Sequence, residues 1–307
     1  MAENNTSKVS SLFTADEVAC GLKAMDRAEC VGLLAKRLEK RKLVGDAESV
    51  VRAVMEREEL GATVVAPGLA VPHARMEGQE RIVIAVATSR EGIRFTDGAD
   101  GAVNLVVMII TGAQAPGAYL KVLSAVVRAF ADPSVIEKVA RIDTAEGVWE
   151  FFDKGAGVLP AFVTAKDMMN PHLLTLKNTD TLAKAIDVFC RHRVARVAIL
   201  DSDGEFVGIV GEEEILKLSL PEYILWLDDL KPILQFEPFG QTLKDEHVTR
   251  LAEIMSPDFV TVSEDAPAIQ VARELMLGKV REVFVTRGKK LIGTIRLHDL
   301  LQRVFRG

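Results

Sequence analysis

Among the five histidines of the sequence, His73 has the neighbours best suited to chemistry. It lies between Pro72 and Arg75, in a segment that opens at Gly61 and turns at Pro67-Gly68. Glycine and proline at these positions indicate a loop with a fixed backbone. An imidazole with an ordinary pKa of about 6.5 is largely neutral and nucleophilic near pH 7. We therefore expect the loop to leave the His73 ring accessible to solvent, where it can attack an incoming group.

Two arginines flank this histidine in the sequence. Arg57 lies upstream and Arg75 lies downstream, and guanidinium groups pair readily with the oxygens of phosphates and carboxylates. The three side chains together can receive an anion and hold it at the ring. The alternative is an ordinary core or surface histidine, because reactive groups are a minority among titratable residues.

The elements that must carry these residues can be predicted from the spacing of apolar side chains. An apolar stripe from Leu22 to Leu38 predicts one helix, and Asp46 is placed to cap a second helix. Apolar runs at Ile82–Thr88 and Val103–Ile110 predict two strands, the second of them central and buried. Pro116 is placed to begin a further helix. Strands and helices that alternate in this way predict a three-layer α/β domain.

The second half of the sequence repeats itself. Met169-Asn170-Pro171 recurs as Met255-Ser256-Pro257, and Val194–Val197 recurs at the same offset as Val280–Val283. A constant offset over a long stretch is typical of one supersecondary unit that is used twice. Each copy is predicted to hold a short strand, an amphipathic helix, a hairpin of two strands and a final helix.

Length and composition favour a globular protein of about two domains. The chain has 307 residues, of which 49% are hydrophobic and 27% charged, and its net charge is −6. This charge favours neither nucleic acid nor an anionic membrane as a partner. The three cysteines show no metal spacing, and no stretch approaches the roughly 18 apolar residues of a membrane span. We expect a cytoplasmic protein without a metal site.

Three segments near His73 carry a recognisable pattern, namely Arg57–Gly61, Gly68–Arg75 and Ala115–Leu123. This pattern resembles the IIA domain of the bacterial phosphotransferase system, in its fructose/mannitol and nitrogen-regulatory branch. The resemblance implies a three-layer α/β domain with a mixed sheet over residues 1–155.

The resemblance also implies a role for His73 as a phosphoryl carrier. It would receive a phosphoryl group from the phosphohistidine of the carrier protein HPr or a homologue, and pass it to a separate IIB protein or keep it as a signal. Arg57 would stabilise the phosphate, with Arg75 as the weaker candidate. No cofactor is required for such a transfer. Tyr119 stands where the family usually has a second histidine, and a phenol donates one hydrogen bond but supplies no positive charge.

The duplicated half resembles a CBS domain pair over residues 164–307, with units at about 164–220 and 250–307. Such pairs commonly bind AMP, ADP, ATP or S-adenosylmethionine between the two units, and they commonly form homodimers. The family signature is a glycine, a hydroxyl residue three positions later and an aspartate three positions after that. The two copies here are Gly208–Glu214 and Gly293–Asp299.

The resemblance singles out five candidate ligand residues, which are Thr175, Glu214, Thr261, Arg296 and Asp299. A carboxylate accepts hydrogen bonds from ribose hydroxyls, and an arginine pairs with phosphate. In the first copy Gly211 and Glu214 replace the usual residues, so we expect weaker binding there. The alternative is that the two acids only cap or decorate helices, since surface acids usually need no special role.

An apolar-rich insertion at residues 221–249 joins the two copies; its aromatic residues and prolines include Tyr223, Trp226, Pro232, Phe236, Pro238 and Phe239. An insertion of this length is either a partner surface or a lid, and we favour a helical dimer or interdomain contact.

Two functions remain open from the sequence. One is a IIA-like phosphocarrier or regulator that is tuned by an adenosyl ligand. The other is a non-catalytic nucleotide-sensing protein whose IIA domain is only a docking module.

Overall fold

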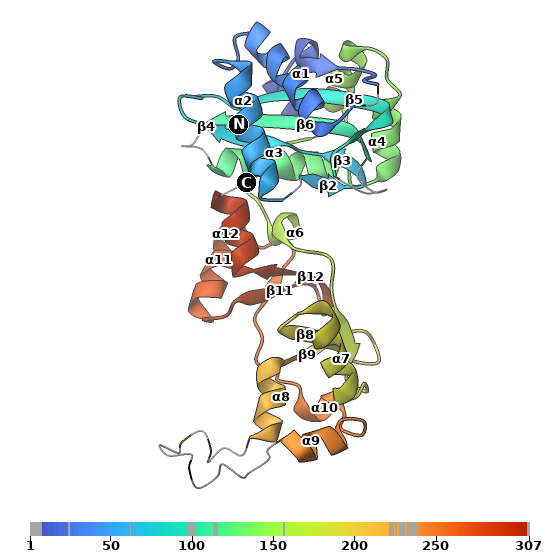
Figure 1. Cartoon of the computed structure of the whole chain (residues 1–307), viewed down its shortest axis with the longest axis vertical. Helices are drawn as coiled ribbons and strands as arrows, with labels where there is room; N and C mark the ends of the chain where they lie inside the picture. Colours follow the sequence, from blue (N-terminus) through green and yellow to red (C-terminus); the bar gives the residue numbers. More distant parts are fainter. Residues whose placement is uncertain are drawn as a thin grey trace, which may run out of the picture. The chain divides into compact units, whose positions relative to one another are not determined.

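The computed structural model describes residues 8–23, 25–61, 63–96, 102–112, 116–155, 157–220, 224, 226, 231 and 239–305. The chain forms two compact units; the first comprises Met1–Val163 with Leu301–Gly307, and the second comprises Thr164–Leu300. Figure 1 shows the labelled elements of both units along the chain. No helix within the described ranges is long and apolar enough to cross a membrane, and no group of three or more His, Cys, Asp or Glu side chains there is placed to hold a metal ion.

A mixed sheet forms the centre of the first unit. Its strands are β1 (Val18–Ala19), β2 (Val64–Ala66), β3 (Gly68–Ala70), β4 (His73–Met76), β5 (Val83–Arg94) and β6 (Ala102–Gly112). The strand order is β1-β5-β6-β3-β2, and β4 pairs with β6 beside β3. β6 runs antiparallel to β5 and parallel to both β3 and β4. The predicted buried central strand is therefore β6.

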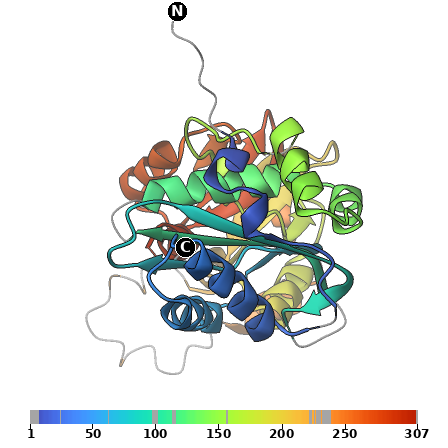
Figure 2. The same cartoon turned by 90° about the horizontal axis from the view of Figure 1, so that it is seen from above.

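Helices cover both faces of this sheet, as the three-layer prediction requires. They are η1 (Val9–Leu12), η2 (Ala15–Glu17), α1 (Arg27–Lys40), α2 (Ala47–Glu59), α3 (Pro116–Ala129), α4 (Pro133–Ala140) and α5 (Ala145–Lys154). In Figure 2 the sheet lies between the blue helices α1 and α2 and the green helices on its other face. Ala85, Met108 and Ile110 of the sheet share a buried apolar cluster with α1 and α2.

Capping residues decide where the first two helices begin. Asp46 caps α2 as predicted, because its side chain accepts a hydrogen bond from the third residue of the helix. The predicted start of the first helix at Leu22 is wrong, since α1 begins at Arg27. Asp26 accepts a hydrogen bond from the Glu29 amide at 2.9 Å, and the Glu29 carboxylate accepts one from the Asp26 amide at 3.1 Å. This capping box makes the helix begin five residues later than the apolar stripe alone suggests.

Each repeat of the second unit has the predicted order of elements, preceded by a short helix that was not predicted. The first holds α6 (Ala165–Met168), β7 (Thr175–Lys177), α7 (Leu182–His192), β8 (Arg196–Leu200), β9 (Phe206–Gly211) and α8 (Glu212–Ser219). The second holds α10 (Leu251–Ile254), β10 (Thr261–Ser263), α11 (Ala268–Leu277), β11 (Glu282–Arg287), β12 (Lys290–Arg296) and α12 (Leu297–Phe305). Both form a three-stranded sheet with one parallel and one antiparallel pair.

The two repeats are joined by a reciprocal contact. The segment after α6 pairs with β12 of the second repeat, and the segment after α10 pairs with β9 of the first. A Cβ atom added at Gly293 would lie 2.5 Å from the Met169 sulfur, and one added at Gly208 would lie 3.0 Å from the Met255 sulfur. The first glycine of each signature is therefore needed because a methionine of the other repeat lies against it.

Of the insertion at residues 221–249, the structure describes positions 224, 226 and 231 and residues 239–249. They include α9 (Phe239–Asp245), which is tied to α8 by a hydrogen bond of 2.8 Å between the Ser219 and Thr242 hydroxyls. Four of the residues named for the insertion lie outside the described ranges, namely Tyr223, Pro232, Phe236 and Pro238. The proposed contact role of the insertion stays a prediction.

Gly293→Ala should lower the free energy of unfolding by about 1–3 kcal/mol, because the added methyl group overpacks the contact with Met169. Urea titration of the full chain measures the change. Met169→Ala on the same chain removes the obstructing side chain, so the double variant should lose less stability than the sum of the two single losses.

Gly32→Ala is the matched control for this substitution. Gly32 lies inside α1, and a Cβ atom there meets no other atom within 4 Å. The change should therefore stabilise the chain by about 0.5–1 kcal/mol through helix propensity. Equal losses from the two alanine substitutions would contradict the proposed overpacking.

Candidate functional site

Residues 68–76 run beside β6 in two pieces. β3 pairs with the first part of β6 and β4 with its last part, both in parallel. Val71 and Pro72 separate the two strands, and the Pro72 carbonyl accepts a hydrogen bond from the Ile109 amide at 3.0 Å. His73 is thus the first residue of β4 and lies opposite Ile109. The central strand fixes the backbone that carries the imidazole.

Alternation along β4 places its side chains on two faces of the sheet. Ala74 is buried in the cluster beneath α1 and α2, and Met76 packs against that cluster. His73 and Arg75 therefore lie on the opposite face. There the His73 ring meets Tyr119 of α3, and the two ring centroids are 4.4 Å apart.

The Nδ1 atom of His73 has two close oxygen neighbours. It lies 2.9 Å from the Val71 carbonyl oxygen and 3.1 Å from the Tyr119 hydroxyl oxygen. A carbonyl oxygen can only accept, so its hydrogen bond with the ring requires the proton on Nδ1. In this tautomer the lone pair is on Nε2, which becomes the nucleophilic nitrogen of the neutral ring.

The expected exposure of the His73 ring to solvent is wrong. The residue is 4% exposed, and Tyr119 is 1% exposed. The reason is that His73 begins a strand of the sheet instead of standing in an open loop, and that Tyr119 covers its ring. The glycine and proline pattern showed where the backbone turns, but it held no information about the helix that packs over it.

The predicted basic groups lie in the same region. Arg57 is in the last turn of α2, and its Nη1 atom donates to the Gly61 carbonyl at 3.2 Å. Burial lowers the pKa of Arg75, while Tyr119 opposes this change and Arg57 adds to it. Arg75 therefore lies within electrostatic reach of both side chains, and Tyr119 in turn contacts His73. The structure brings the four predicted residues into one region.

Two residues that the sequence analysis passed over lie at the base of this region. Glu58 and Thr63 are buried, with 3% and 5% of their surface exposed. Glu58 stands in a charge run that is typical of a solvated helix end. It nevertheless continues the buried stripe of α2 that contains Val50 and Val54, at a spacing of four residues. That register is the signal that could have identified it.

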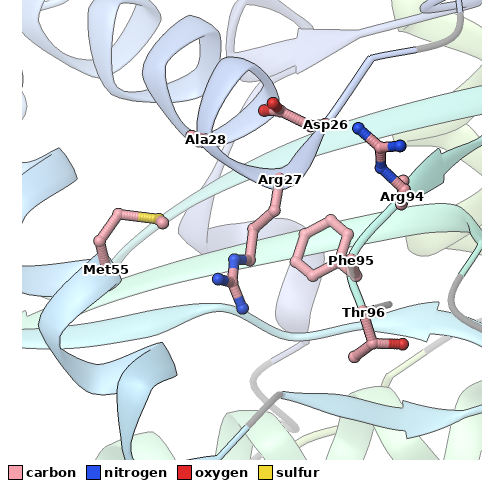
Figure 3. Close-up of a pocket in the computed structure, with 7 residues that line it drawn as sticks. All are labelled: Asp26, Arg27, Ala28, Met55, Arg94, Phe95 and Thr96. Atoms are coloured by element: carbon pink, nitrogen blue, oxygen red, sulfur yellow. The ribbon is translucent and has the colours of Figure 1, made fainter. Parts of the chain in front are cut away.

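A pocket of about 330 Å³ lies at the start of α1; its lining residues are Asp26, Arg27, Ala28, Met55, Arg94, Phe95 and Thr96. Figure 3 shows the Arg27 side chain running between Met55 and Phe95. The Nη1 atom of Arg27 donates to the Glu58 carboxylate at 3.3 Å. The pocket contains none of the four predicted site residues, but Arg27 connects it to the buried Glu58.

The candidate ligand residues of the second unit have separate partners. Arg296 and Asp299 bond to each other, with Nε–Oδ2 and Nη2–Oδ1 distances of 2.9 and 3.2 Å. Glu214 accepts a hydrogen bond from the Gly211 amide at 2.9 Å and so caps α8, which is the alternative role named for it above. Thr175 and Thr261 are the exposed first residues of β7 and β10.

The first signature has no space for the usual hydroxyl residue. A Cβ atom at Gly211 would lie 2.9 Å from the Arg196 side chain and 3.0 Å from the Ala195 carbonyl oxygen. The clash with the backbone cannot be relieved by a rotamer change. Glycine at this position therefore follows from packing, and the first copy differs from the second in shape as well as in charge.

One carboxylate lies near arginines of both repeats. Arg196 and Glu282 begin β8 and β11 and so occupy equivalent positions. Burial raises the pKa of Glu282, while a hydrogen bond with Thr294 and the charges of Arg296 and Arg196 oppose this change. Glu282 has no signal in the sequence, because the facing of the two repeats is a tertiary feature.

Known families match the two units separately. The family described as phosphoenolpyruvate-dependent sugar phosphotransferase system, EIIA 2, matches residues 11–155. The CBS domain family matches residues 165–220 and 251–306.

Individual relatives match the first unit. The PTS system fructose-specific EIIA component of Haloferax volcanii is 31% identical over 105 residues, which are 34% of this chain and 68% of that protein. The PTS system 2-O-alpha-mannosyl-D-glycerate-specific EIIABC component of Escherichia coli K12 is 28% identical over 156 residues, which are 50% of this chain and 24% of that protein. A solved structure, the nitrogen regulatory protein IIA-Ntr from Neisseria meningitidis, is 25% identical with a TM-score of 0.43, and the match covers 47% of this chain and 98% of that one.

This chain belongs to the EIIA type 2 family of the phosphotransferase system, and a tandem pair of CBS domains follows its EIIA domain. It spans between 22% and 31% of the length of the first curated relatives it matches. What those proteins do as a whole therefore does not transfer directly to this chain.

Glu282→Gln should raise the free energy of unfolding at neutral pH. A raised pKa means that the folded protein holds the ionised carboxylate at a cost, and glutamine removes the charge while keeping an oxygen that can accept from Thr294. The gain should shrink as the pH falls, because protonation of Glu282 in the wild type relieves the same cost. Thermal unfolding at a series of pH values measures this difference.

Glu212→Gln, at an exposed position of α8, should change stability little at every pH. A gain for Glu282→Gln that grows on acidification would reverse the expected sign and refute the explanation.

Proposed function

We propose that this chain is a phosphoryl-accepting regulator, in which His73 takes a phosphoryl group from the phosphohistidine of HPr or a homologue. The observation that supports this most directly is the contact of 2.9 Å between His73 Nδ1 and the Val71 carbonyl. It keeps the ring proton on Nδ1 and leaves the lone pair of Nε2 to attack phosphorus.

The transfer is an in-line displacement between two imidazoles. The N–P bond of the donor breaks and its electron pair stays on the donor nitrogen, while the lone pair of His73 Nε2 forms the new N–P bond. The positive charge of the phosphorylated donor ring passes to the His73 ring, and the Nδ1 proton stays against the Val71 carbonyl. The protein supplies positioning and charge, which are the main terms in phosphoryl transfer.

The groups around the ring suit the charge that this step brings in. Arg57 and Arg75 complement the phosphoryl oxygens, with Arg57 as the principal partner. Because the Nδ1 proton already points at Val71, the Tyr119 hydroxyl is not required as a donor to the ring. It can donate to a phosphoryl oxygen, in place of the second histidine that the family usually has.

The burial of His73 favours a second candidate function. A ring with 4% of its surface exposed reacts only if docking of the donor moves part of its cover. If no donor does so, the EIIA domain is a docking module and the protein is a non-catalytic nucleotide-sensing regulator. The two candidates share a partner surface and differ in whether a covalent bond forms.

For the CBS pair, we propose that AMP, ADP, ATP or S-adenosylmethionine binds at the second repeat and tunes the first unit. Each Asp299 oxygen that accepts from Arg296 keeps a further lone pair for a ribose hydroxyl, and the exposed Arg296 can turn to a phosphate. Thr261 would take part there. Glu214 is committed to its helix and Gly211 brings no hydroxyl group, so the first repeat, with Thr175, does not suit the ligand.

We propose a homodimer through the CBS pair in a cytoplasmic setting, with a IIB protein as an onward acceptor. On α11 the side chains of Ile269, Met276 and Leu277 are 78%, 71% and 64% exposed. Their spacing places them along one side of the helix, and clustered exposed apolar side chains are typical of protein contacts.

Incubation with enzyme I, HPr and labelled phosphoenolpyruvate should place acid-labile label on this chain. His73→Ala should abolish the label, and Arg57→Ala should slow its incorporation by roughly 100-fold through the loss of one charged contact. His172→Ala is the control, since His172 is exposed in the second unit, and it should label normally. Label that survives in His73→Ala would refute the assignment of His73 as the acceptor. If no cognate donor labels the wild type, the phosphocarrier function is refuted and the docking module is the function that remains.

ATP, AMP or S-adenosylmethionine should raise the melting temperature of the full chain. A ligand that binds only the folded state adds about 2.7 kcal/mol to the free energy of unfolding when its concentration is 100 times its Kd. Asp299→Ala should remove the shift, and Glu214→Ala should keep it. If titration calorimetry detects no heat of binding for any of the three ligands, the proposed adenosyl site is refuted.

A further inference from the structure

Glu58 is a buried carboxylate with three donors from two separate segments. Its side chain is fully buried, while that of Arg27 is 28% exposed. Arg27 Nη1 and the Thr63 amide each lie 3.3 Å from Oε2. The Thr63 hydroxyl donates to Oε1 in a short hydrogen bond. A buried charge of this kind is held only when its hydrogen bonds are satisfied, so the position of Thr63 is tied to it.

Thr63 in turn holds the residue that faces His73. Its carbonyl accepts a hydrogen bond from the Val71 amide at 2.9 Å. Val71 is fully buried, and Pro72 follows it directly. The Val71 carbonyl belongs to the Val71–Pro72 peptide, so it is held by its two neighbours: the peptide before it donates to Thr63, and the peptide after it accepts from Ile109.

The Val71 carbonyl competes with Tyr119 for the same nitrogen of His73. With the proton on Nδ1, the ring donates to Val71 and Nε2 is nucleophilic. With the proton on Nε2, Tyr119 can donate to Nδ1, but the carbonyl oxygen then faces a nitrogen lone pair at 2.9 Å and repels it. The position of the Val71 carbonyl thus decides which tautomer is favoured.

We propose that Glu58 is a positioning residue that selects the Nδ1-protonated tautomer of His73 through Thr63 and Val71. The effect of Glu58 on the reactivity of Nε2 rests on the proposed function. Its effect on the tautomer of His73 does not. The chain of contacts runs from Arg27 in the pocket of Figure 3 to the imidazole. Glu58 acts through it at a distance, because its own hydrogen bonds are with Arg27 and Thr63.

The test measures the tautomer directly by ¹⁵N NMR of the ring nitrogens in the full chain, at a pH where His73 is neutral. In the wild type, Nδ1 should give the signal of a protonated nitrogen and Nε2 that of a nitrogen with a lone pair. Glu58→Gln, which loses the charge and half of the acceptor capacity, should shift both signals towards a mixture of tautomers. Glu59→Gln, at the exposed neighbouring position, should leave both unchanged.

A second pair of variants keeps the test decisive if Glu58→Gln fails to fold. Thr63→Val removes the hydroxyl group at nearly constant shape and should give the mixed signals, whereas Thr63→Ser keeps the hydroxyl and should restore the wild-type pattern. Unchanged ring signals in Glu58→Gln and Thr63→Val would overturn the proposal. So would a shift in Thr63→Ser as large as that in Thr63→Val.

Phosphorylation kinetics provide a separate measurement of the consequence. Glu58→Gln and Thr63→Val should slow phosphorylation of His73 by roughly 10- to 100-fold, the usual effect of misplacing a reacting group. If the wild type accepts no phosphoryl group, the proposed function fails while the NMR result still decides the role of Glu58. If the ring signals change but the rate does not, Glu58 controls the tautomer without limiting transfer, and the consequence drawn for Nε2 is refuted.

Discussion

A neutral imidazole has one proton for two nitrogens, and in this protein the Val71 carbonyl decides where that proton lies. The contact of 2.9 Å between its oxygen and His73 Nδ1 has meaning only if the carbonyl cannot move. β3, β4 and Pro72 fix it along β6, and the buried network of Glu58 fixes it from the other side. Strand β6, helices α1 and α2, and the buried Glu58 carboxylate therefore all help to hold a single hydrogen bond in place.

The sequence predicts what depends on local contacts, and it fails where a distant element decides. Asp46 could be recognised as a cap because its partner lies three residues away, and the repeats because their spacing is constant. The start of α1 was misplaced because an apolar stripe continues into an extended segment that packs on the same core. The enclosure of His73 depends on Tyr119 of α3, which is 46 residues away in the sequence. The inward direction of Glu58 follows from the register of α2, a local signal that the surrounding charge run obscured. The enclosure of His73 has no signature at its own position.

The two CBS repeats show how a backbone constraint can stay symmetric while the chemistry diverges. Met169 against Gly293 and Met255 against Gly208 are the same contact made twice, so both glycines are explained by one packing rule. Three residues further on, the two repeats differ. The first repeat has Gly211 beside a backbone carbonyl, and the second has Arg296 paired with Asp299. The signature in the sequence located these positions, but it could not reveal that Arg296 and Asp299 bond to each other or that no hydroxyl residue fits in the first copy.

If His73 carries a phosphoryl group as proposed, enclosure of its ring has opposite effects on gaining and on keeping that group. It slows access of a donor, because part of the cover must move first. It also excludes water from the N–P bond once formed, which protects a labile intermediate from hydrolysis. Tyr119 adds to this balance, since a neutral phenol binds a phosphoryl oxygen but contributes no charge to the transfer itself. Under the proposed function, a chain with these features is better suited to hold the phosphoryl group as a signal than to pass it on rapidly. The adenosyl site proposed for the CBS pair is where such a signal would be combined with a second one.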